Sequence, residues 1–556
     1  MKAPSIESLF RSVFVRIALL LAFGSLSSTA SATVYTWDSD ATLGNGATEG
    51  SGTWNTTNYD WINNSGASAK FSSSSANSVV FAGVADGTYQ ITLGGAYSIS
   101  MLTFSTSGYT LVAPTPYTLT ILNITLGSGV TATIGSGVTV TRTSTAADEY
   151  VVGGGLSSEL IIQTGGSVLL ATSGHSLHLQ GITVTVDGGT LSSTGGGTGN
   201  GTIYLADGGV GDSAVLNVEN GGLVSTGMGG KLLYGSSSGT QTAVVNLDGG
   251  TIQTSAVGRA YVASNQNFIF NFNGGTLQCN SDTNASSFMG GITHAYVKEG
   301  GAKIDDGGYA ITISQALEHG GTAAQDGGLT KSGIGTLTLT GTSTYTGNTT
   351  IQSGTLALNS AGSISSSTLV LGISGSAQGT FDVSSKSSYS MANISGNGTI
   401  KSGGTFTATG SLTPGFTNVA GSLNVSGNFT LAGTAVTSME ILGTGGVAGT
   451  DYDLISVTNL LTYGGALVIT CSDLADGLYD FFNFASYTGD FSSVTVNGIS
   501  LIETGGVWSY ASGSYSYSFT ESTGILSVIA VPEPATYVML VSGLGMLGML
   551  RRKFRA

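Results

Sequence analysis

The sequence Val186-Asp187-Gly188-Gly189-Thr190-Leu191 is the best guide to the fold, because variants of it recur along the chain. The same pattern appears as Glu219-Asn220-Gly221-Gly222-Leu223, Leu247-Asp248-Gly249-Gly250-Thr251-Ile252 and Phe272-Asn273-Gly274-Gly275-Thr276-Leu277. In each copy an Asp or Asn side chain can cap its own turn, glycine tolerates a positive φ, and a strand-forming run follows. Each copy therefore predicts a strand, a tight turn and a second strand.

Gly-Gly pairs of this kind recur at a nearly constant spacing. Six of them lie at 165–166, 188–189, 221–222, 249–250, 274–275 and 300–301. The first begins at 165 and the last at 300, so the mean period over the five intervals is about 27. This period, with short strands and no helical pattern, is typical of a right-handed parallel β-helix or a related β-solenoid. A β-propeller is the alternative, although its blades need about 40 to 50 residues.

The composition favours a strand-rich body over a disordered chain. Glycine accounts for 88 of the 556 residues, and only 8 % are charged, against about 25 % in ordinary globular domains. Apolar residues make up 40 % and occur in short runs such as Val244-Val245-Asn246-Leu247. We expect an all-β chain with a β-solenoid over residues 33–327, a distinct repeat at 328–358 and a further β-rich region over 359–528.

The body between the two ends is strongly acidic. The chain has 16 basic and 31 acidic residues, and seven of the basic residues and Glu7 lie in the two end segments. Removing these residues and Glu533 of the second end segment leaves 9 basic and 29 acidic residues, a net charge of about −20. Phosphate binding needs clustered Lys and Arg, so no nucleic-acid partner is expected.

Residues 1–32 have the three parts of a secretory signal peptide. The apolar run at 17–26 is too short to cross a bilayer core of about 30 Å as a helix, which disfavours a permanent anchor. We therefore predict export by Sec-type machinery and cleavage after Ala32. The basic segment consists of Lys2, Arg11 and Arg16, and the small residues before the cleavage site are Ala30, Ser31 and Ala32.

Residues 529–556 form a second end segment. A rigid motif comes first, 16 uncharged residues at 535–550 follow, and a basic end closes the chain. Those 16 residues would form a helix of roughly 24 Å, which is marginal for a bilayer, with the basic end on the cytoplasmic side. A plain C-terminal anchor is one interpretation. The motif is Val531-Pro532-Glu533-Pro534, and the basic stop contains Arg551, Arg552, Lys553 and Arg555.

This order of parts resembles the PEP-CTERM sorting tail, in which a Val-Pro-Glu-Pro motif precedes a short Gly-rich transmembrane helix and an Arg-rich end. The resemblance covers only the end of the chain, from Val531 to Ala556. It implies that an exosortase-like membrane protease recognises the motif and removes the tail, typically in bacteria that make exopolysaccharide. The protein would be anchored in the membrane before processing and then remain on the cell surface or in the extracellular matrix.

A second resemblance concerns residues 328–358, where apolar and polar residues alternate between glycines. The stretch begins Gly328-Leu329-Thr330-Lys331-Ser332-Gly333-Ile334-Gly335 and closely resembles the autotransporter-associated β-strand repeat. Tyr35-Thr36-Trp37-Asp38, Leu412-Thr413-Pro414-Gly415 and Asp451-Tyr452-Asp453 are similar to segments that accompany this repeat. The resemblance implies a β-helical, passenger-like body.

Few residues are candidates for catalysis or metal binding. His175 and His178 are three apart in a strand-like stretch, so their side chains fall on opposite faces and cannot share one metal. His294 and His319 are isolated and are expected to face solvent. Asp451 and Asp453 are two apart, as a carboxylate pair for glycoside hydrolysis would require, but a recurrent structural segment is the simpler interpretation. Asp305-Asp306-Gly307-Gly308 and Asp326-Gly327-Gly328 are interpreted as turns.

Three further features carry expectations. Gly208-Gly209-Val210-Gly211-Asp212 is similar to calcium-binding repeats but occurs once. Cys279 and Cys471 are expected to be buried free thiols, with one disulfide as the alternative. Open ends of stacked coils promote aggregation unless they are covered. Trp37, Trp54 and Trp61 therefore predict an N-terminal cap within residues 33–62, and an aromatic cluster in a loop is the alternative.

We predict a non-enzymatic, exported surface or matrix protein with a structural or adhesive role and no cofactor or metal. One alternative is a glycan-binding module, with Tyr and Phe side chains on one face of the rod as sugar platforms. A second alternative is a β-helical polysaccharide lyase or hydrolase, which would need acidic and basic groups together in one groove. Exopolysaccharide is a candidate partner.

Overall fold

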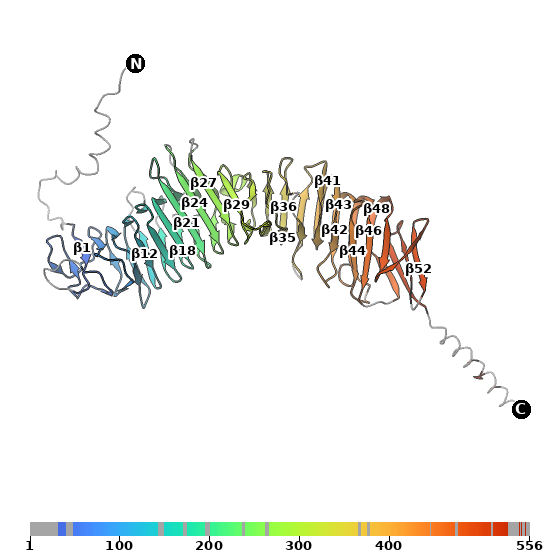
Figure 1. The fold of residues 1–556 in the computed structure, drawn as a ribbon, viewed down its shortest axis with the longest axis horizontal. Helices are drawn as coiled ribbons and strands as arrows, with labels where there is room; N and C mark the ends of the chain where they lie inside the picture. The colour runs from blue at the N-terminus through green and yellow to red at the C-terminus, as the bar shows by residue number, and fades with distance from the viewer. Residues whose placement is uncertain are drawn as a thin grey trace, which may run out of the picture.

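The protein is an elongated all-β rod, with β1 near one end and β52 near the other (Figure 1). In the described part of the chain there are 54 strands and one short 3₁₀ helix, η1 (Asp282–Ser287). This computed structural model describes residues 32–40, 48–142, 150–170, 175–194, 201–235, 239–261, 266–364, 368–374, 378–444, 446–472, 476–512 and 515–531, with residues 544, 546, 547 and 551.

Two parallel sheets are confined to the N-terminal part of the rod, and two short antiparallel strands, β3 and β4, extend the first. In spatial order, sheet 1 is β26 (Val257–Arg259), β23 (Leu232–Tyr234), β20 (Ile203–Leu205), β17 (Leu177–Gln180), β14 (Tyr150–Gly154), β11 (Asn123–Leu126), β8 (Met101–Phe104), β5 (Ser78–Phe81), β1 (Val34–Trp37), β3 (Trp61–Ile62) and β4 (Ser68–Ala69). Sheet 2 is β2 (Gly52–Trp54), β6 (Tyr89–Leu93), β9 (Tyr109–Val112), β12 (Thr131–Ile134), β15 (Glu159–Gln163), β18 (Ile182–Asp187), β21 (Ser213–Glu219), β24 (Thr242–Asp248), β27 (Asn267–Phe272), β29 (His294–Val297) and β32 (Leu317–His319).

Sheet 3 runs through both parts of the rod. It contains β7 (Tyr97–Ser98), β10 (Tyr117–Thr120), β13 (Val138–Arg142), β16 (Ser167–Leu170), β19 (Thr190–Ser193), β22 (Leu223–Thr226), β25 (Thr251–Thr254), β28 (Thr276–Cys279), β30 (Ala302–Asp305), β33 (Leu329–Ser332), β35 (Thr349–Ile351), β37 (Leu369–Leu371), β40 (Ile394–Gly396), β42 (Ser411–Pro414), β44 (Val436–Ile441), β46 (Ala466–Cys471), β49 (Ser493–Val496) and β50 (Ile499–Ser500). Each strand pairs with those of the neighbouring coils, and the first and last coils lie at opposite ends of the rod, so the sheet is an open ladder (Figure 1).

Sheet 4 takes the place of sheet 1 in the C-terminal part. Its strands are β31 (Ala310–Ile313), β34 (Thr336–Leu339), β36 (Gly354–Leu358), β38 (Gly379–Val383), β41 (Gly398–Ala408), β43 (Ser422–Leu431), β45 (Leu454–Thr462) and β48 (Phe482–Thr488), with β39 (Ser388–Met391) added beside β41. Met289 joins the two sheets, since it forms single parallel bridges to Val257 and to Ile313.

The coils therefore change from three strands to two. Up to β33 the chain visits sheets 1 or 4, 2 and 3 in turn, whereas from β34 onward it alternates between sheets 4 and 3. Successive register partners in sheet 3 from Val224 to Lys331 agree with the mean period of about 27. The next two partners, Ile351 and Leu371, follow at shorter and equal steps. The all-β prediction is confirmed, and the long parallel sheets are consistent with a β-helix or solenoid.

The interior is apolar because alternate residues of each strand point inward. In β21, Ala214, Leu216 and Val218 are buried, whereas Val215 and Asn217 lie on the outer face and are half-buried. Inward residues of successive coils stack on one another and form one continuous core along the rod.

The Gly-Gly turns have two separate physical causes. In five of the six pairs the first glycine takes a positive φ, which is 69° at Gly188 and 79° at Gly221, whereas in the pair 300–301 the second glycine does. The second lies against the preceding coil, since a Cβ at Gly189 would be 2.4 Å from the Ile162 carbonyl oxygen. A Cβ at Gly222 would be 2.1 Å from the Val186 carbonyl oxygen. In each pair, therefore, one glycine is needed for the backbone conformation of the turn and the other for the close stacking of the coils.

Both ends of the rod are covered. Trp37, Trp54 and Trp61 are buried together, with the ring centroids of Trp37 and Trp61 5.0 Å apart, which confirms the predicted N-terminal cap. At the other end lies an antiparallel sheet that the sequence did not indicate. Its strands are β47 (Gly477–Asp480), β54 (Ile525–Ala530), β53 (Tyr515–Thr520), β52 (Val507–Ser512) and β51 (Ile502–Thr504).

The two cysteines do not form a disulfide. Cys279 is buried, as expected, whereas Cys471 is only half-buried. Within the described ranges, the structure contains no helix whose length and apolar character would allow it to cross a membrane.

Candidate binding surface

The predicted processing residues lie at the borders of the folded body. Ala32 is exposed two residues before β1, and Val531 directly follows β54. Arg551 is exposed and helical. The other predicted residues of the two ends, Ala30, Pro532, Glu533, Pro534, Arg552, Lys553 and Arg555, are outside the described residues. The two cleavages and the helix at 535–550 remain predictions.

Each of three histidines contacts a carboxylate. His178 is buried, and its Nδ1 lies 2.5 Å from Asp207 Oδ2. The rings of His294 and His319 are partly exposed, but their Nδ1 atoms lie 3.1 Å from Glu318 and 2.8 Å from Asp326. The expectation that these two histidines face solvent holds in part, but the expectation that they are isolated is wrong, because each contacts a carboxylate. Pairing of β29 with β32 brings Glu318 beside His294, and Asp326 reaches His319 from the loop that follows β32.

Buried charges in the repeat at 328–358 hold turns in place. Lys331 is fully buried, forms an ion pair with Asp306, and donates to the carbonyl oxygens of Gly333 (2.7 Å) and Ser353 (2.9 Å). Burial lowers the pKa of Lys331, although Asp306 opposes the shift. Asp306 also accepts from the Gly335 N–H at 3.0 Å. These contacts agree with the interpretation of Asp305-Asp306-Gly307-Gly308 as a turn.

Asp326 has the same kind of structural role. It accepts from the backbone N–H groups of Gly328 (2.9 Å), Thr346 (2.8 Å) and Gly347 (2.8 Å). Burial raises the pKa of the Asp326 carboxyl, but these bonds and the His319 contact outweigh burial, so the pKa is lowered. The side chain therefore fixes two neighbouring turns of the repeat.

Asp451 and Asp453 are not arranged as a hydrolytic pair. Asp453 is fully buried and accepts from the backbone N–H groups of Gly421 and Glu440, both at 2.8 Å. Asp451 accepts from the N–H of Val447 in its own turn. Burial raises the pKa of Asp453 to about 7, while the two N–H groups lower it and Glu440 raises it. Both carboxylates are engaged by the backbone, as a structural segment requires.

Aromatic side chains do not form one outer face in the described part of the chain. Phe268, Phe270 and most other Phe and Tyr side chains lie in the core. The exposed tyrosines, Tyr59, Tyr261 and Tyr487, lie in widely separated coils. Most large rings therefore fill the interior of the stack, and the sugar platforms of the glycan-binding alternative stay a prediction.

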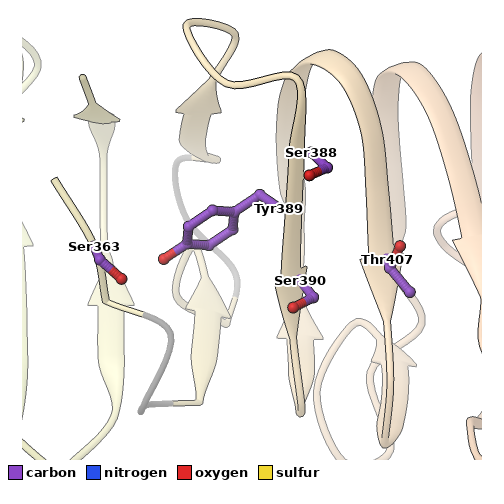
Figure 2. Close-up of a pocket in the computed structure, with 5 residues that line it drawn as sticks. All are labelled: Ser363, Ser388, Tyr389, Ser390 and Thr407. Atoms are coloured by element: carbon purple, nitrogen blue, oxygen red, sulfur yellow. The ribbon is translucent and has the colours of Figure 1, made fainter. Parts of the chain in front are cut away.

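Two polar pockets open on the surface. The Tyr389 pocket, of about 380 Å³, is lined by Ser363, Ser388, Tyr389, Ser390 and Thr407. Figure 2 shows the Tyr389 ring directed toward Ser363, while Ser388 and Ser390 flank it on β39. The Tyr389 hydroxyl accepts from the Ile364 N–H at 2.9 Å. This pocket contains hydroxyl groups but no charged lining residue.

The second pocket, of about 540 Å³, has a different chemistry and is called here the Gly153 pocket. Gln180 and Asp212 supply polar groups, and Leu156 and Val210 are exposed apolar residues of its lining. The remaining lining residues are Thr125, Val151, Gly153, Gly154, Gly181, Gly208, Gly211 and Ser213. The calcium-like motif thus forms one side of a pocket. Among the described residues, no group of three or more His, Cys, Asp or Glu could hold a metal ion.

Comparisons with known proteins identify the repeat and the tail. The passenger-associated-transport repeat matches residues 329–358, and the PEP-CTERM protein-sorting motif matches residues 530–555. The adhesin BmaC autotransporter of Brucella suis biovar 1 (strain 1330) is 29 % identical over 241 residues. That match covers 38 % of this chain and only 7 % of the adhesin. No solved structure matches.

These matches confirm both resemblances found in the sequence, and they indicate an exported cell-surface protein. The chain carries a PEP-CTERM sorting motif at its C-terminal end and a passenger-associated-transport repeat in its body.

Proposed function

We propose that this chain is a non-enzymatic structural or adhesive protein of the cell surface or extracellular matrix, built as a right-handed parallel β-solenoid. The observation that carries the proposal is a rod covered at both ends and continued by a sorting motif directly after its last strand. Such a rod offers long sides for contact rather than one enclosed site. The adhesin that resembles part of the chain supports the adhesive role.

The route to the surface is the second part of the proposal. Sec-type machinery exports the chain, the signal peptide is removed after Ala32, and the apolar segment 535–550 holds the tail in the membrane. An exosortase-like protease then recognises Pro532-Glu533-Pro534 and releases the body, with the basic residues from Arg551 onward as the stop. The body remains on the surface or in an exopolysaccharide matrix.

The described side chains favour a structural role over catalysis. Asp306, Asp326 and Asp453 bind backbone groups. Neither pocket has a described Lys or Arg in its lining, whereas the lyase or hydrolase alternative requires acidic and basic groups in one groove. This arrangement favours a protein that binds a partner over one that catalyses a reaction.

Intact-mass analysis of the protein from the producing cells tests the route. We expect a species that begins at Thr33 and lacks the basic C-terminal end. A mature species that retains Arg551 to Arg555 would contradict tail processing. Surface labelling and attachment assays of cells with and without the gene test the role, and equal attachment of both would contradict adhesion.

A further inference from the structure

The Gly153 pocket is created by a missing side chain on the outer face of sheet 1. Thr125, Gly153 and Gln180 are register neighbours on β11, β14 and β17, so they form one row across three coils. Gly153 leaves a gap in this row between two longer side chains. Its φ is not in the left-handed region, and the nearest atom to a Cβ there would be Val151 Cγ1 at 3.2 Å. Another residue could therefore adopt this backbone conformation, but its side chain would fill the pocket.

Gln180 is held in a fixed orientation at one side of this gap. Its Nε2 donates to Asp207 Oδ1 at 3.0 Å, and Asp207 Oδ2 lies 2.5 Å from His178 Nδ1. His178 is buried and stacks on Tyr204 with ring centroids 4.9 Å apart. Because Nε2 is engaged, the amide Oε1 is left as an acceptor, and no described residue donates to it.

Asp212 supplies more acceptors from the facing loop. Its Oδ2 accepts from the Gly208 N–H at 2.7 Å and its Oδ1 from the Ser213 N–H at 2.9 Å. The Gly181 backbone also interacts with this carboxylate, so about one of its four acceptor positions remains for a ligand. The backbone bonds fix the carboxylate in place before a ligand arrives, which reduces the entropy lost on binding.

The pocket therefore combines preorganised acceptors with apolar contacts. Leu156 and Val210 are 81 % and 78 % exposed, and both belong to its lining. A sugar residue has hydroxyl donors around its ring and apolar C–H groups on its faces, which suit these two kinds of group. Asp207 and Asp212 would repel an anionic sugar, and the acidic body adds to that repulsion.

The Tyr389 pocket differs in ways that make it a useful comparison. Its Tyr389 hydroxyl already accepts from Ile364, and its ring lies 5.8 Å from the Phe381 ring, as part of the core packing. The other polar groups in its lining are Ser and Thr hydroxyls, without a carboxylate or an amide side chain. It is smaller than the Gly153 pocket and has no oriented charged acceptor.

We propose that the Gly153 pocket binds a sugar residue of a neutral or amine-bearing polysaccharide, with Gln180 and Asp212 accepting hydrogen bonds from it. The inference rests on the proposed function, because it gives the adhesive rod its ligand class. Leu156 and Val210 contact the C–H face of the sugar, and Gly153 provides the space.

Calorimetric titration of the purified full chain tests this proposal. The probes are a soluble cello-oligosaccharide, a chitosan oligosaccharide and polygalacturonate. We expect the first or the second to bind and the third not to bind. Gly153→Val fills the pocket and should weaken binding by about tenfold or more. Asp212→Asn removes the charge and should weaken the chitosan oligosaccharide more than the neutral probe.

Ser390→Val, in the Tyr389 pocket, is the matched control and should leave binding unchanged. Leu156→Ser is a second variant in case Gly153→Val fails to fold. The Leu156 side chain is exposed, so this change should leave the fold intact while it weakens binding. Three outcomes would overturn the inference. Neither the uncharged nor the amine-bearing probe binds, the chain prefers polygalacturonate, or Ser390→Val weakens binding as much as Gly153→Val does. Cells that display the protein and attach while the purified chain binds no sugar would refute this site alone. Absence of the protein from the surface would refute the proposed function instead.

Discussion

The three-strand coils before residue 329 and the two-strand coils after it are held together by different groups. In the first part, outward amides bind across coils: Asn246 donates to Asn217 and Asn271 donates to Asn246, both at 2.8 Å. At the junction and beyond, buried charged side chains such as Lys331 and Asp453 bind backbone groups of neighbouring turns. The two steps in sheet 3 that follow Lys331, to Ile351 and to Leu371, are also shorter than those before it.

The difference follows from the geometry of the turns. Lys331, Asp326 and Asp453 each bind backbone N–H or C=O groups that lie in turns or at strand ends. Buried backbone groups must be hydrogen-bonded, and side chains supply the partners where strands do not. The stability of the two-strand coils therefore depends on a few buried polar residues, and that of the three-strand coils on repeated glycines and amides.

The largest expected effect is at the junction. Lys331→Met leaves Asp306 as a buried charge without its partner and should lower the free energy of unfolding by about 3 to 5 kcal/mol. Chemical denaturation followed by circular dichroism measures it. Lys401→Met is the control, because Lys401 is half exposed and lies 4.0 Å from Asp382, where an ion pair contributes about 0 to 1 kcal/mol. Equal effects of the two changes would contradict a special role for buried charge in the shorter coils.

The second effect is a pH dependence at Asp453. The folded protein keeps the proton on this carboxyl up to about pH 7, whereas the unfolded chain releases it near the ordinary value of 3.8. The folded state thus binds more protons between these values, so its stability is greatest below the lower value and falls as pH rises to about 7. Asp453→Asn is uncharged at every pH, like the protonated carboxyl, so the unfolding midpoints of the two proteins should be closest near pH 4 and should diverge toward pH 8, where the wild type is the less stable. A constant difference between them would show that Asp453 does not titrate in this range.

A third effect concerns the glycines of the longer coils. Gly222→Ala places a Cβ against the Val186 carbonyl oxygen and should lower the free energy of unfolding by about 1 to 3 kcal/mol. Gly433→Ala is the comparison, because no atom lies within 4 Å of a Cβ there. Thermal unfolding of both variants checks the prediction, and a neutral Gly222→Ala would show that the coils can move apart at little cost.

The smallest effect is expected in the amide row of sheet 2. Asn246→Ala removes two hydrogen bonds between coils at a half-buried position, each of which contributes about 0.5 to 1.5 kcal/mol or less when water can replace it. Thermal unfolding should show a modest decrease. A loss as large as that of Lys331→Met would mean that the two parts of the rod are stabilised alike.

Much of the fold could be predicted because the repeat is local. The pair Gly221-Gly222 needs only its own turn conformation and the neighbouring coil, and the period fixes that neighbour. The candidate site could not be predicted in the same way. Thr125, Gly153 and Gln180 lie in three different coils, and only the stacking register puts them in one row. The same register also places Asp207 beside His178.

We could predict the strand alternation, the coil period, the capping tryptophans and the sorting motif from the sequence, because each depends on neighbouring residues or on one constant spacing. Packing between coils sets the change from three-strand to two-strand coils, the antiparallel C-terminal sheet and the Gly153 pocket. The coil spacing is uneven, since the step from Val224 to Ile252 in sheet 3 is longer than the step from Lys331 to Ile351. Side-chain neighbours across coils therefore follow from the register that packing selects.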